Sequence, residues 1–364
     1  MSKTKKMGVA TAAIATLLLA ACSSGEGEAS GAGGEVTLHY STMLTKDHSA
    51  SQLFEVWMEN VTEQTDGAVQ FESYYDGSLC TQADALSCAE SGTADVIFDS
   101  PVFHPEMVAT NVPAIGFQTF DVDAQARTAA TLSEEFPEFD QPYEDRNQHV
   151  LFTIANAPPV LALSEPIESI ADLDGLSIRA TGNPGVGLEL LGANPVAIEA
   201  HEVYESVERG VVSGLAYGFD QVLDAQLYEV APHIYDLSEI GVYATQTWTI
   251  NQDSFAALSS EQQAVLDDVS KTLMEERGTE FVKAKIAEFC ETMEANDVSV
   301  GKLTPDAEVS AWQEEGLKVV TDNWLAQAND AGLNDPEALL ARSSELLDAN
   351  AADDAQTIFE SCNG

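Results

Sequence analysis

The chain has 364 residues, of which 61 are acidic and 15 are lysine or arginine, so its formal net charge is −46 at pH 7. A field this negative repels nucleic acids and anionic membrane surfaces, which excludes both as expected partners. The hydrophobic fraction of 45% is that of a folded protein, which excludes a disordered acidic chain. The length is common for a protein of two lobes.

The first 22 residues predict a processing segment rather than part of the fold. Three lysines precede a run of small and apolar residues at 9–21, which is too short to be a comfortable membrane span. The run ends in LAAC and resembles a lipobox, in which a lipid-modified Cys22 becomes the new N-terminus. We expect a lipoprotein signal peptide at 1–21 and a flexible polar tether at 22–34. Ordinary cleavage near Ala21 is the alternative.

Strand and helix patterns alternate along the first part of the folded chain and predict an α/β lobe at 35–155. The order strand–helix–strand–helix–strand indicates a parallel sheet with ligand-binding loops at the strand ends. The expected elements are strand 36–41, helix 49–65, strand 68–74, helix 79–91, strand 94–98, helix 124–136 and strand 149–155.

The same alternation continues and predicts a second lobe at 156–245, followed at 246–364 by a return strand to lobe 1 and C-terminal helices. Ser259 and Gln262 form a capping-box pattern at the start of a long helix, 259–294. The other expected elements are strand 159–163, strand 176–180, helix 185–191, strand 195–198, helix 202–209, strand 214–218, strand 246–251, helix 306–332 and helix 336–350.

Arg179 is the most informative candidate site residue. It is one of only six arginines, and it ends a short strand just before a glycine-rich turn. Its planar guanidinium can bind a carboxylate through two parallel hydrogen bonds, so the position favours capture of an anion. A structural ion pair with one of the many acidic residues is equally consistent with the residues alone.

Three segments around this arginine, DLDGLSIR, LGANPV and EVYESVERGVVSG, together resemble the solute-binding proteins of tripartite ATP-independent (TRAP) transporters. Weaker similarity extends from about residue 35 to about residue 321. The resemblance implies a two-lobed periplasmic-binding-protein-like α/β fold, with a ligand cleft between the lobes and a long helix bracing both. It implies an extracytoplasmic receptor rather than an enzyme, and the expected lipid on Cys22 would anchor this receptor to the membrane. Arg179 would bind the carboxylate of a small organic acid, which the protein would deliver to the membrane permease.

The chain departs from the family pattern at two positions that bear on the ligand. Tyr217 stands where the family often has a ligand-binding asparagine, and Pro159 stands near the position of a second ligand arginine in sialic-acid-type members. A large sugar acid anchored twice is therefore disfavoured. A compact or aromatic monocarboxylate fits better, with Tyr217 offering a ring face and a hydroxyl; a core role for this tyrosine is the alternative.

Further candidate ligand contacts lie next to Ser41 and at the other expected strand ends of lobe 1, on the return strand, and just before the expected helix 202–209. Asp99 can instead cap the following turn, and Trp248 can instead be a core residue. A small residue at 200 leaves extra room for a ligand. These candidates are Thr42, Met43, Asp99, Ser100, Trp248 and Ala200.

The four cysteines after Cys22 predict two disulfides in an exported chain. Of the three possible pairings we prefer Cys80–Cys88 with Cys290–Cys362. Metal-site spacing, a phosphate-binding loop and a nucleophile elbow are all missing from the sequence, so no metal, cofactor or catalytic residue is expected. The rival interpretations are a binding protein of an ATP-driven importer for amino acids or peptides, a sensor-coupled binding protein and a secreted hydrolase.

Overall fold

The computed structural model describes residues 34–198, 202–274, 278–303 and 306–364. The expected signal peptide, Cys22, nearly all of the expected tether and Ala200 lie outside these ranges. The described chain is a mixed α/β structure built around two separate sheets, as the sequence predicts.

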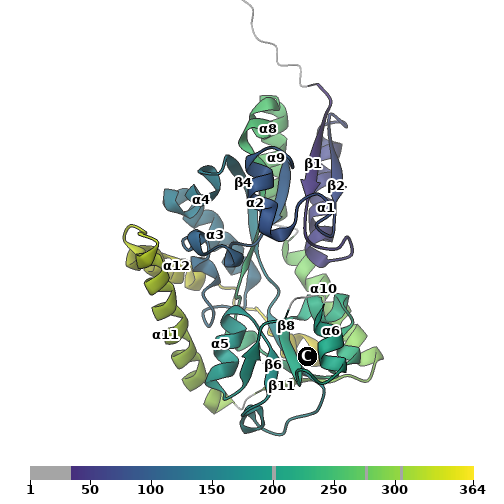
Figure 1. Ribbon diagram of the computed structural model, residues 1–364, viewed down its shortest axis with the longest axis vertical. Helices are drawn as coiled ribbons and strands as arrows, with labels where there is room; N and C mark the ends of the chain where they lie inside the picture. Colours follow the sequence, from purple (N-terminus) through teal and green to yellow (C-terminus); the bar gives the residue numbers. More distant parts are fainter. Residues whose placement is uncertain (1–33, 199–201, 275–277, 304–305) are drawn as a thin grey trace, which may run out of the picture. The chain divides into compact units, whose positions relative to one another are not determined.

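The first sheet, which we call sheet A, forms the centre of lobe 1 in the strand order β2-β1-β3-β10-β4. Its strands are β1 (Val36–Ser41), β2 (Val69–Tyr74), β3 (Val96–Asp99), β4 (Gln148–Ala155) and β10 (Thr245–Asn251). The helices of this part are α1 (Ser49–Gln64), α2 (Ala85–Glu90), α3 (Val122–Glu135), α4 (Gln141–Glu144) and α8 (Gln252–Ala257). Figure 1 shows these elements in its upper half.

Large aromatic side chains hold α1 against sheet A. Phe54 of α1 stacks on Trp57 at 4.9 Å and on Trp248 of β10 at 5.5 Å, and Phe152 of β4 stacks on Trp248 at 4.8 Å. All four side chains are almost completely buried. Burial of this much aromatic surface fixes the pairing of helix and sheet.

The second sheet, sheet B, forms the centre of lobe 2 in the order β11-β9-β5-β8-β6-β7. Its strands are β5 (Pro159–Leu163), β6 (Ser177–Arg179), β7 (Asn194–Val196), β8 (Gly214–Gly218), β9 (His233–Asp236) and β11 (Val300–Lys302). The helices α5 (Gly182–Leu190), α6 (Val203–Glu208) and α7 (Phe219–Asp224) accompany it in the lower half of Figure 1. A glycine is required at 214, because a Cβ there would lie 2.2 Å from the carbonyl oxygen of Ala162 on β5.

The expectation of parallel sheets is only partly correct. β10 runs antiparallel to β3 and β4, and β5 runs antiparallel to β8 and β9. The chain enters lobe 2 through β5 and returns to lobe 1 through β10. Each of these strands therefore starts at the edge of its sheet where the parallel strands end. The short strands β9 and β11 were not expected.

The long helical region consists of α9 (Ser260–Thr272) and α10 (Gly278–Ala295), and residues 275–277 lie outside the described ranges. The Ser259–Gln262 capping box is present. α9 packs on α1 and β4 of lobe 1, whereas α10 packs on α7 and on α13 (Ile358–Asn363) at lobe 2. The two helices together therefore contact both lobes.

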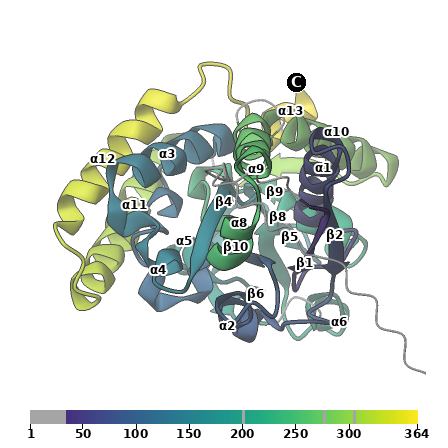
Figure 2. The same ribbon diagram turned by 90° about the horizontal axis from the view of Figure 1, so that it is seen from above.

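A continuous apolar core occupies one flank of the molecule. It joins the segment after β3, represented by Val108 and Phe117, to Ile178 of β6 and to Trp312 and Trp324. The two tryptophans belong to α11 (Asp306–Asp330), which lies beside α12 (Pro336–Asn350) on the left in Figures 1 and 2. This flank core combines residues from both halves of the chain.

Two disulfides are present, with the pairing that we preferred. Cys80 is bonded to Cys88 of α2, and Cys290 of α10 is bonded to Cys362 of α13. The second bond attaches the C-terminal helix to the helix that contacts lobe 2.

Candidate functional site

The edges of sheets A and B where the chain crosses between lobes lie next to each other. β4 is followed by β5 after only residues 156–158, and the second crossing segment, 237–244, leads from β9 to β10. The two crossing segments are joined by a hydrogen bond from the N–H of Asn156 to the carbonyl of Ala244 at 3.0 Å. Strand ends from both sheets therefore meet in this region, which is where ligands bind in folds of this kind.

Arg179 ends β6 at this edge and is only 5% exposed. Its Nε donates a hydrogen bond to the carbonyl of Ile198 at 3.1 Å, and its guanidinium carbon lies 4.1 Å from the ring centroid of Tyr217. It makes no ion pair with any carboxylate of the described residues. Because a buried charge without a counter-ion is costly, this cation is suited to an incoming anion.

A second tyrosine, Tyr243, lies in the crossing segment beside this pair. Burial raises the pKa of Tyr243, and the neighbouring Tyr217 and Asp220 raise it further, whereas a hydrogen bond with Asn156 and the charge of Arg179 lower it. The side chains of Tyr243, Tyr217, Asp220, Asn156 and Arg179 therefore lie close enough to influence one another's charge. Sequence reasoning missed Tyr243 and Asn156; the only signal for them is that polar residues occupy linkers between predicted strands.

Three buried polar atoms at the edge of sheet A make no hydrogen bond with the residues that the structure describes. They are the hydroxyl oxygens of Ser41 and Thr245 and the side-chain carbonyl oxygen of Asn156. Leaving a buried polar atom without a hydrogen bond lowers stability by about 1–3 kcal/mol, so water or a polar ligand is expected to hydrogen-bond to these three atoms. Ser41 adjoins the predicted contacts Thr42 and Met43.

Two predicted contacts at the end of β3 have partners within the protein. Asp99 is fully buried and bonds to His104 Nε2 and to the hydroxyl of Tyr143, each at 2.8 Å. Ser100 donates to the carbonyl of Thr245 at 2.7 Å. Both side chains therefore fix the loop after β3.

The remaining predicted contacts are also placed by the structure. The Thr42 hydroxyl accepts a hydrogen bond from the N–H of Leu44 at 3.1 Å, and Met43 packs partly buried against the core of lobe 1. Trp248 is fully buried in that core, and its indole N–H donates to Tyr40 at 3.2 Å. Trp248 is therefore a core residue in this structure.

A polar contact between α1 and α7 joins the two lobes near Arg179. The hydroxyl of Ser49 donates to Asp220 at 2.8 Å and to Asp224 at 3.2 Å, and the N–H of Ser49 donates to Asp224 at 3.1 Å. Burial raises the pKa of Asp220, although nearby His48 and the Ser49 hydrogen bond lower it. No local pattern in the sequence indicates this contact, since its partners are 171 residues apart.

Among residues 34–198, 202–274, 278–303 and 306–364, no helix combines the length and apolar character that a membrane crossing requires. In the same ranges, side chains that bind metals do not gather in groups of three or more.

Two α/β lobes whose strand edges meet at two crossing segments, with a buried cation at that edge, define a two-lobed solute-binding protein. The chain belongs to the bacterial extracellular solute-binding proteins of family 7, whose model matches residues 40–327. The members of this family are binding proteins rather than enzymes.

Similar proteins carry named ligands. The ectoine-binding periplasmic protein TeaA of Halomonas elongata is 24% identical over 319 residues, which cover 83% of this chain and 84% of TeaA. A TRAP periplasmic solute-binding protein of Bordetella bronchiseptica, solved with (R)- and (S)-mandelate, matches with a TM-score of 0.74 and 24% identity over 87% of this chain and all of that chain. A TRAP solute-binding protein of Rhodoferax ferrireducens, solved with benzoate, matches with a TM-score of 0.74 and 22% identity, covering 86% and 98% of the two chains.

Proposed function

We propose that this protein is the extracytoplasmic receptor of a TRAP transporter, that it captures a small organic acid by pairing the acid's carboxylate with Arg179, and that it delivers the acid to the membrane permease. The observation that carries the proposal is a guanidinium that is 5% exposed and pairs with no carboxylate of the described chain. Family membership supports the receptor role.

Among the residues that the structure describes, none accepts a hydrogen bond from the terminal nitrogens of Arg179, which can therefore serve a ligand. Its Nε is held by the carbonyl of Ile198, and its plane lies over the ring of Tyr217. Both contacts reduce the freedom of the side chain before the ligand arrives, so less entropy is lost on binding. A carboxylate can then accept two hydrogen bonds from the fixed guanidinium.

The buried polar atoms at the edge of sheet A that lack a partner among the described residues indicate what else the ligand carries. The hydroxyls of Ser41 and Thr245 can donate or accept, and Asn156 offers a carbonyl oxygen. With Pro159 at the start of β5, the edge of sheet B has no second arginine at that position. Ectoine, benzoate and mandelate, the ligands named for the relatives, each carry one carboxyl group on a compact body. We therefore assign a compact monocarboxylate, with a ring or a short chain.

The proposed location is the outer face of the cell membrane, through a lipid on Cys22. The LAAC sequence and the polar residues that follow support this part of the proposal. A tether of this kind keeps the receptor near its permease while the folded part moves in solvent.

Calorimetric titration with a panel of compact monocarboxylates tests the binding site. Arg179→Ala is expected to weaken binding by about 3–5 kcal/mol, which is at least a hundredfold, because the ligand's charge would be buried unpaired. Arg209→Ala is the matched control, since that arginine is exposed at the end of α6 and its ion pair within the described chain is with Glu205 at 2.9 Å. Equal affinities of the two variants for every acid that binds the wild type would refute the role of Arg179.

A further inference from the structure

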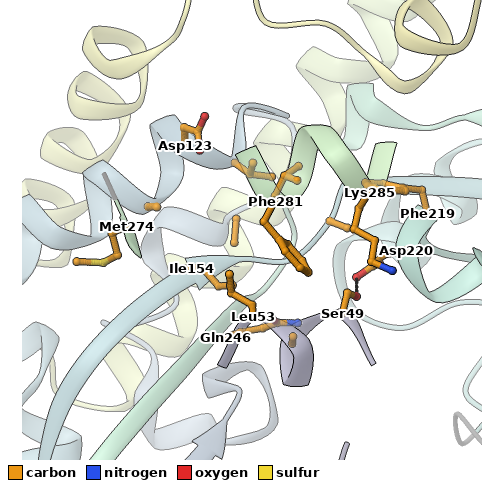
Figure 3. A pocket seen from close by; sticks show the side chains of 16 residues that line it. Ser49, Leu53, Asp123, Ile154, Phe219, Asp220, Gln246, Met274, Phe281 and Lys285 are labelled. Carbon is orange, nitrogen blue, oxygen red and sulfur yellow. Dashed lines mark hydrogen bonds between the residues drawn. The ribbon is translucent and has the colours of Figure 1, made fainter. Parts of the chain in front are cut away.

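Two cavities border the segments by which the chain crosses between the lobes. The smaller one, of about 60 Å³, has the carboxyl groups of Asp123 and Asp220 in its wall, and Figure 3 shows both. The lysine of that wall, Lys285, already pairs with two acidic residues, so the smaller cavity is unsuited to an acid. The larger one, of about 340 Å³, has Tyr243 in its wall. Its volume lies within the range of about 300–1,000 Å³ that is typical of small-molecule sites.

The larger cavity lies within reach of an acid that is bound to Arg179. Gly182 and Asn183, at the start of α5, line the cavity and follow Arg179 by only three and four residues. Three residues of chain span at most about 11 Å, so the backbone of Gly182 lies no further than that from the backbone of Arg179. Tyr243 also lines the cavity, and its charge is influenced by Arg179. The part of the acid that carries no charge can therefore extend into this cavity.

The wall of the larger cavity carries little charge for a protein this acidic. Within the described chain, no aspartate, glutamate, lysine or arginine lines it, and Val108, Ile115 and Val186 give it apolar surface. A second charged group on the ligand would lose hydration without gaining a counter-ion, so the wall favours an acid whose remaining body is uncharged. Besides Tyr243, the side chain of this wall that titrates is His104.

His104 has one ring nitrogen without a partner among the described residues. Its Nε2 donates to the carboxylate of Asp99 at 2.8 Å, and the same carboxylate accepts from the hydroxyl of Tyr143 at 2.8 Å. Because Asp99 is fully buried and bonded twice, it fixes the orientation of the imidazole. Nδ1 makes no hydrogen bond with any residue that the structure describes. Nδ1 is therefore the ring atom that can meet a ligand in the cavity.

A hydroxyl group suits Nδ1 in both protonation states of the ring. The hydrogen bond to Asp99 raises the pKa of His104, so the protonated ring persists to higher pH than usual. In the protonated ring Nδ1 donates, whereas in the neutral ring, with its hydrogen on Nε2, Nδ1 accepts. A hydroxyl oxygen can accept and its hydrogen can donate, whereas a carbonyl group can only accept.

We propose that His104 selects acids that carry a hydroxyl group on their uncharged body, through a hydrogen bond between that hydroxyl and Nδ1. This inference rests on the proposed function, because Arg179 must hold the carboxylate for the body to enter the cavity. The hydrocarbon part of the body lies against Val108 and Ile115. Asp99 is a positioning residue here, since it orients His104 and does not touch the ligand.

Calorimetric titration of the full folded chain with matched pairs of acids tests the selection. The pairs are mandelate with phenylacetate, 3-hydroxybenzoate with benzoate, and 3-hydroxyphenylacetate with phenylacetate. In the wild type, the hydroxy acid of at least one pair is expected to bind about fivefold more tightly, which corresponds to one net hydrogen bond. Equal affinities within all three pairs overturn the inference.

His104→Gln separates the hydroxyl contact from the support of the loop. Glutamine can keep an N–H donor to Asp99 in place of Nε2, but it has no atom in place of Nδ1. The variant is expected to bind both acids of a pair with the affinity that the wild type has for the acid without the hydroxyl. A folded variant that keeps the wild-type preference overturns the inference.

Arg179→Ala distinguishes this inference from the proposed function. It is expected to weaken both acids of a pair by about a hundredfold or more, because both lose the same partner for their carboxylate. If Arg179→Ala changes neither affinity, or if no acid binds the wild type, the proposed function fails and this inference fails with it. If Arg179→Ala weakens both acids and His104→Gln keeps the preference, only this inference fails.

NMR of the wild-type protein decides the question if His104→Gln does not fold. With ¹⁵N-labelled histidine, the Nδ1 signal of His104 is expected to shift more with the hydroxy acid than with its partner acid at saturation. His149 is the internal control, because it stacks on Phe255 at 4.5 Å and does not line the cavity. Equal shifts of the His104 signal with the two acids overturn the inference.

Discussion

Replacing Ser49 by alanine removes the hydroxyl that joins α1 to α7. In the native structure this hydroxyl donates to Asp220 at 2.8 Å, and both residues are less than a tenth exposed. Without it, the one donor to the Asp220 carboxylate that remains among the described residues is the N–H of Gln221. The backbone N–H of Ser49, which donates to Asp224, is unaffected by the substitution.

The size of the effect follows from the charge and burial of the acceptor. A hydrogen bond to a charged group contributes about 1.5–3 kcal/mol net, and a buried carboxylate that loses a donor cannot recover it from bulk water. We therefore expect Ser49→Ala to lower the free energy of unfolding by about 1.5–3 kcal/mol at neutral pH. Because the hydroxyl stabilises the ionised form of Asp220, its loss raises the pKa of Asp220 further, and the difference between variant and wild type shrinks as the pH falls.

Urea denaturation at neutral and mildly acidic pH measures this difference. Ser51→Ala is the matched control, since Ser51 is a fully buried serine of the same helix whose hydroxyl makes no hydrogen bond with the described residues. It is expected to leave stability unchanged or slightly increased. If Ser49→Ala and Ser51→Ala have the same stability at neutral pH, the contact between α1 and α7 contributes nothing and the reasoning is wrong.

Two further predictions concern a covalent bond and a histidine. Replacing Cys290 and Cys362 together by serine is expected to lower the free energy of unfolding by about 4 kcal/mol in the chain-entropy model, because the disulfide closes a loop of 72 residues. Thermal unfolding measures this loss. The model would be contradicted if removing the Cys80–Cys88 disulfide, whose sequence separation is 8, lowered stability more. The hydrogen bond to Asp99 raises the pKa of His104 above its ordinary 6.5. The stabilisation by His104 is thus fully present below pH 6.5 and is lost as the pH rises through the raised value. The melting temperatures of wild type and His104→Asn should converge as the pH rises from 6.5 through the raised pKa. A constant difference between the two melting temperatures over this pH range would show that the charge on His104 does not stabilise the fold.

Much of the local structure could be predicted from the sequence because its signals are local. The bounds expected for β1, β5, β8 and α12 are the ones observed, since alternating patterns and flanking glycine or proline mark these segments. The position of Arg179 at a strand end follows from the same pattern. The family model supports the fold class and the receptor assignment.

What could not be predicted depends on residues far apart in the chain. β11 exists because Val300 pairs with Ile234, and three residues are too few to carry a periodic signal. The direction of β10 is set by the crossing of the chain from lobe 2 into lobe 1, not by its own residues. The sequence left the role of Trp248 open because an aromatic residue in a strand suits either a core or a ligand, and only the packing of Phe54 and Phe152 decides it.

The flank core described above makes the two sides of the molecule mechanically unequal. On the side of α11 and α12, separating the lobes would expose apolar surface around Phe117, Trp312 and Trp324 to water. On the side of α1 and α7, the described contact consists of a few hydrogen bonds from one serine. A rotation of one lobe against the other therefore costs the least free energy when its axis runs along the flank core. In such a rotation the lobes separate at Ser49, and the apolar surface around Trp312 and Trp324 stays buried.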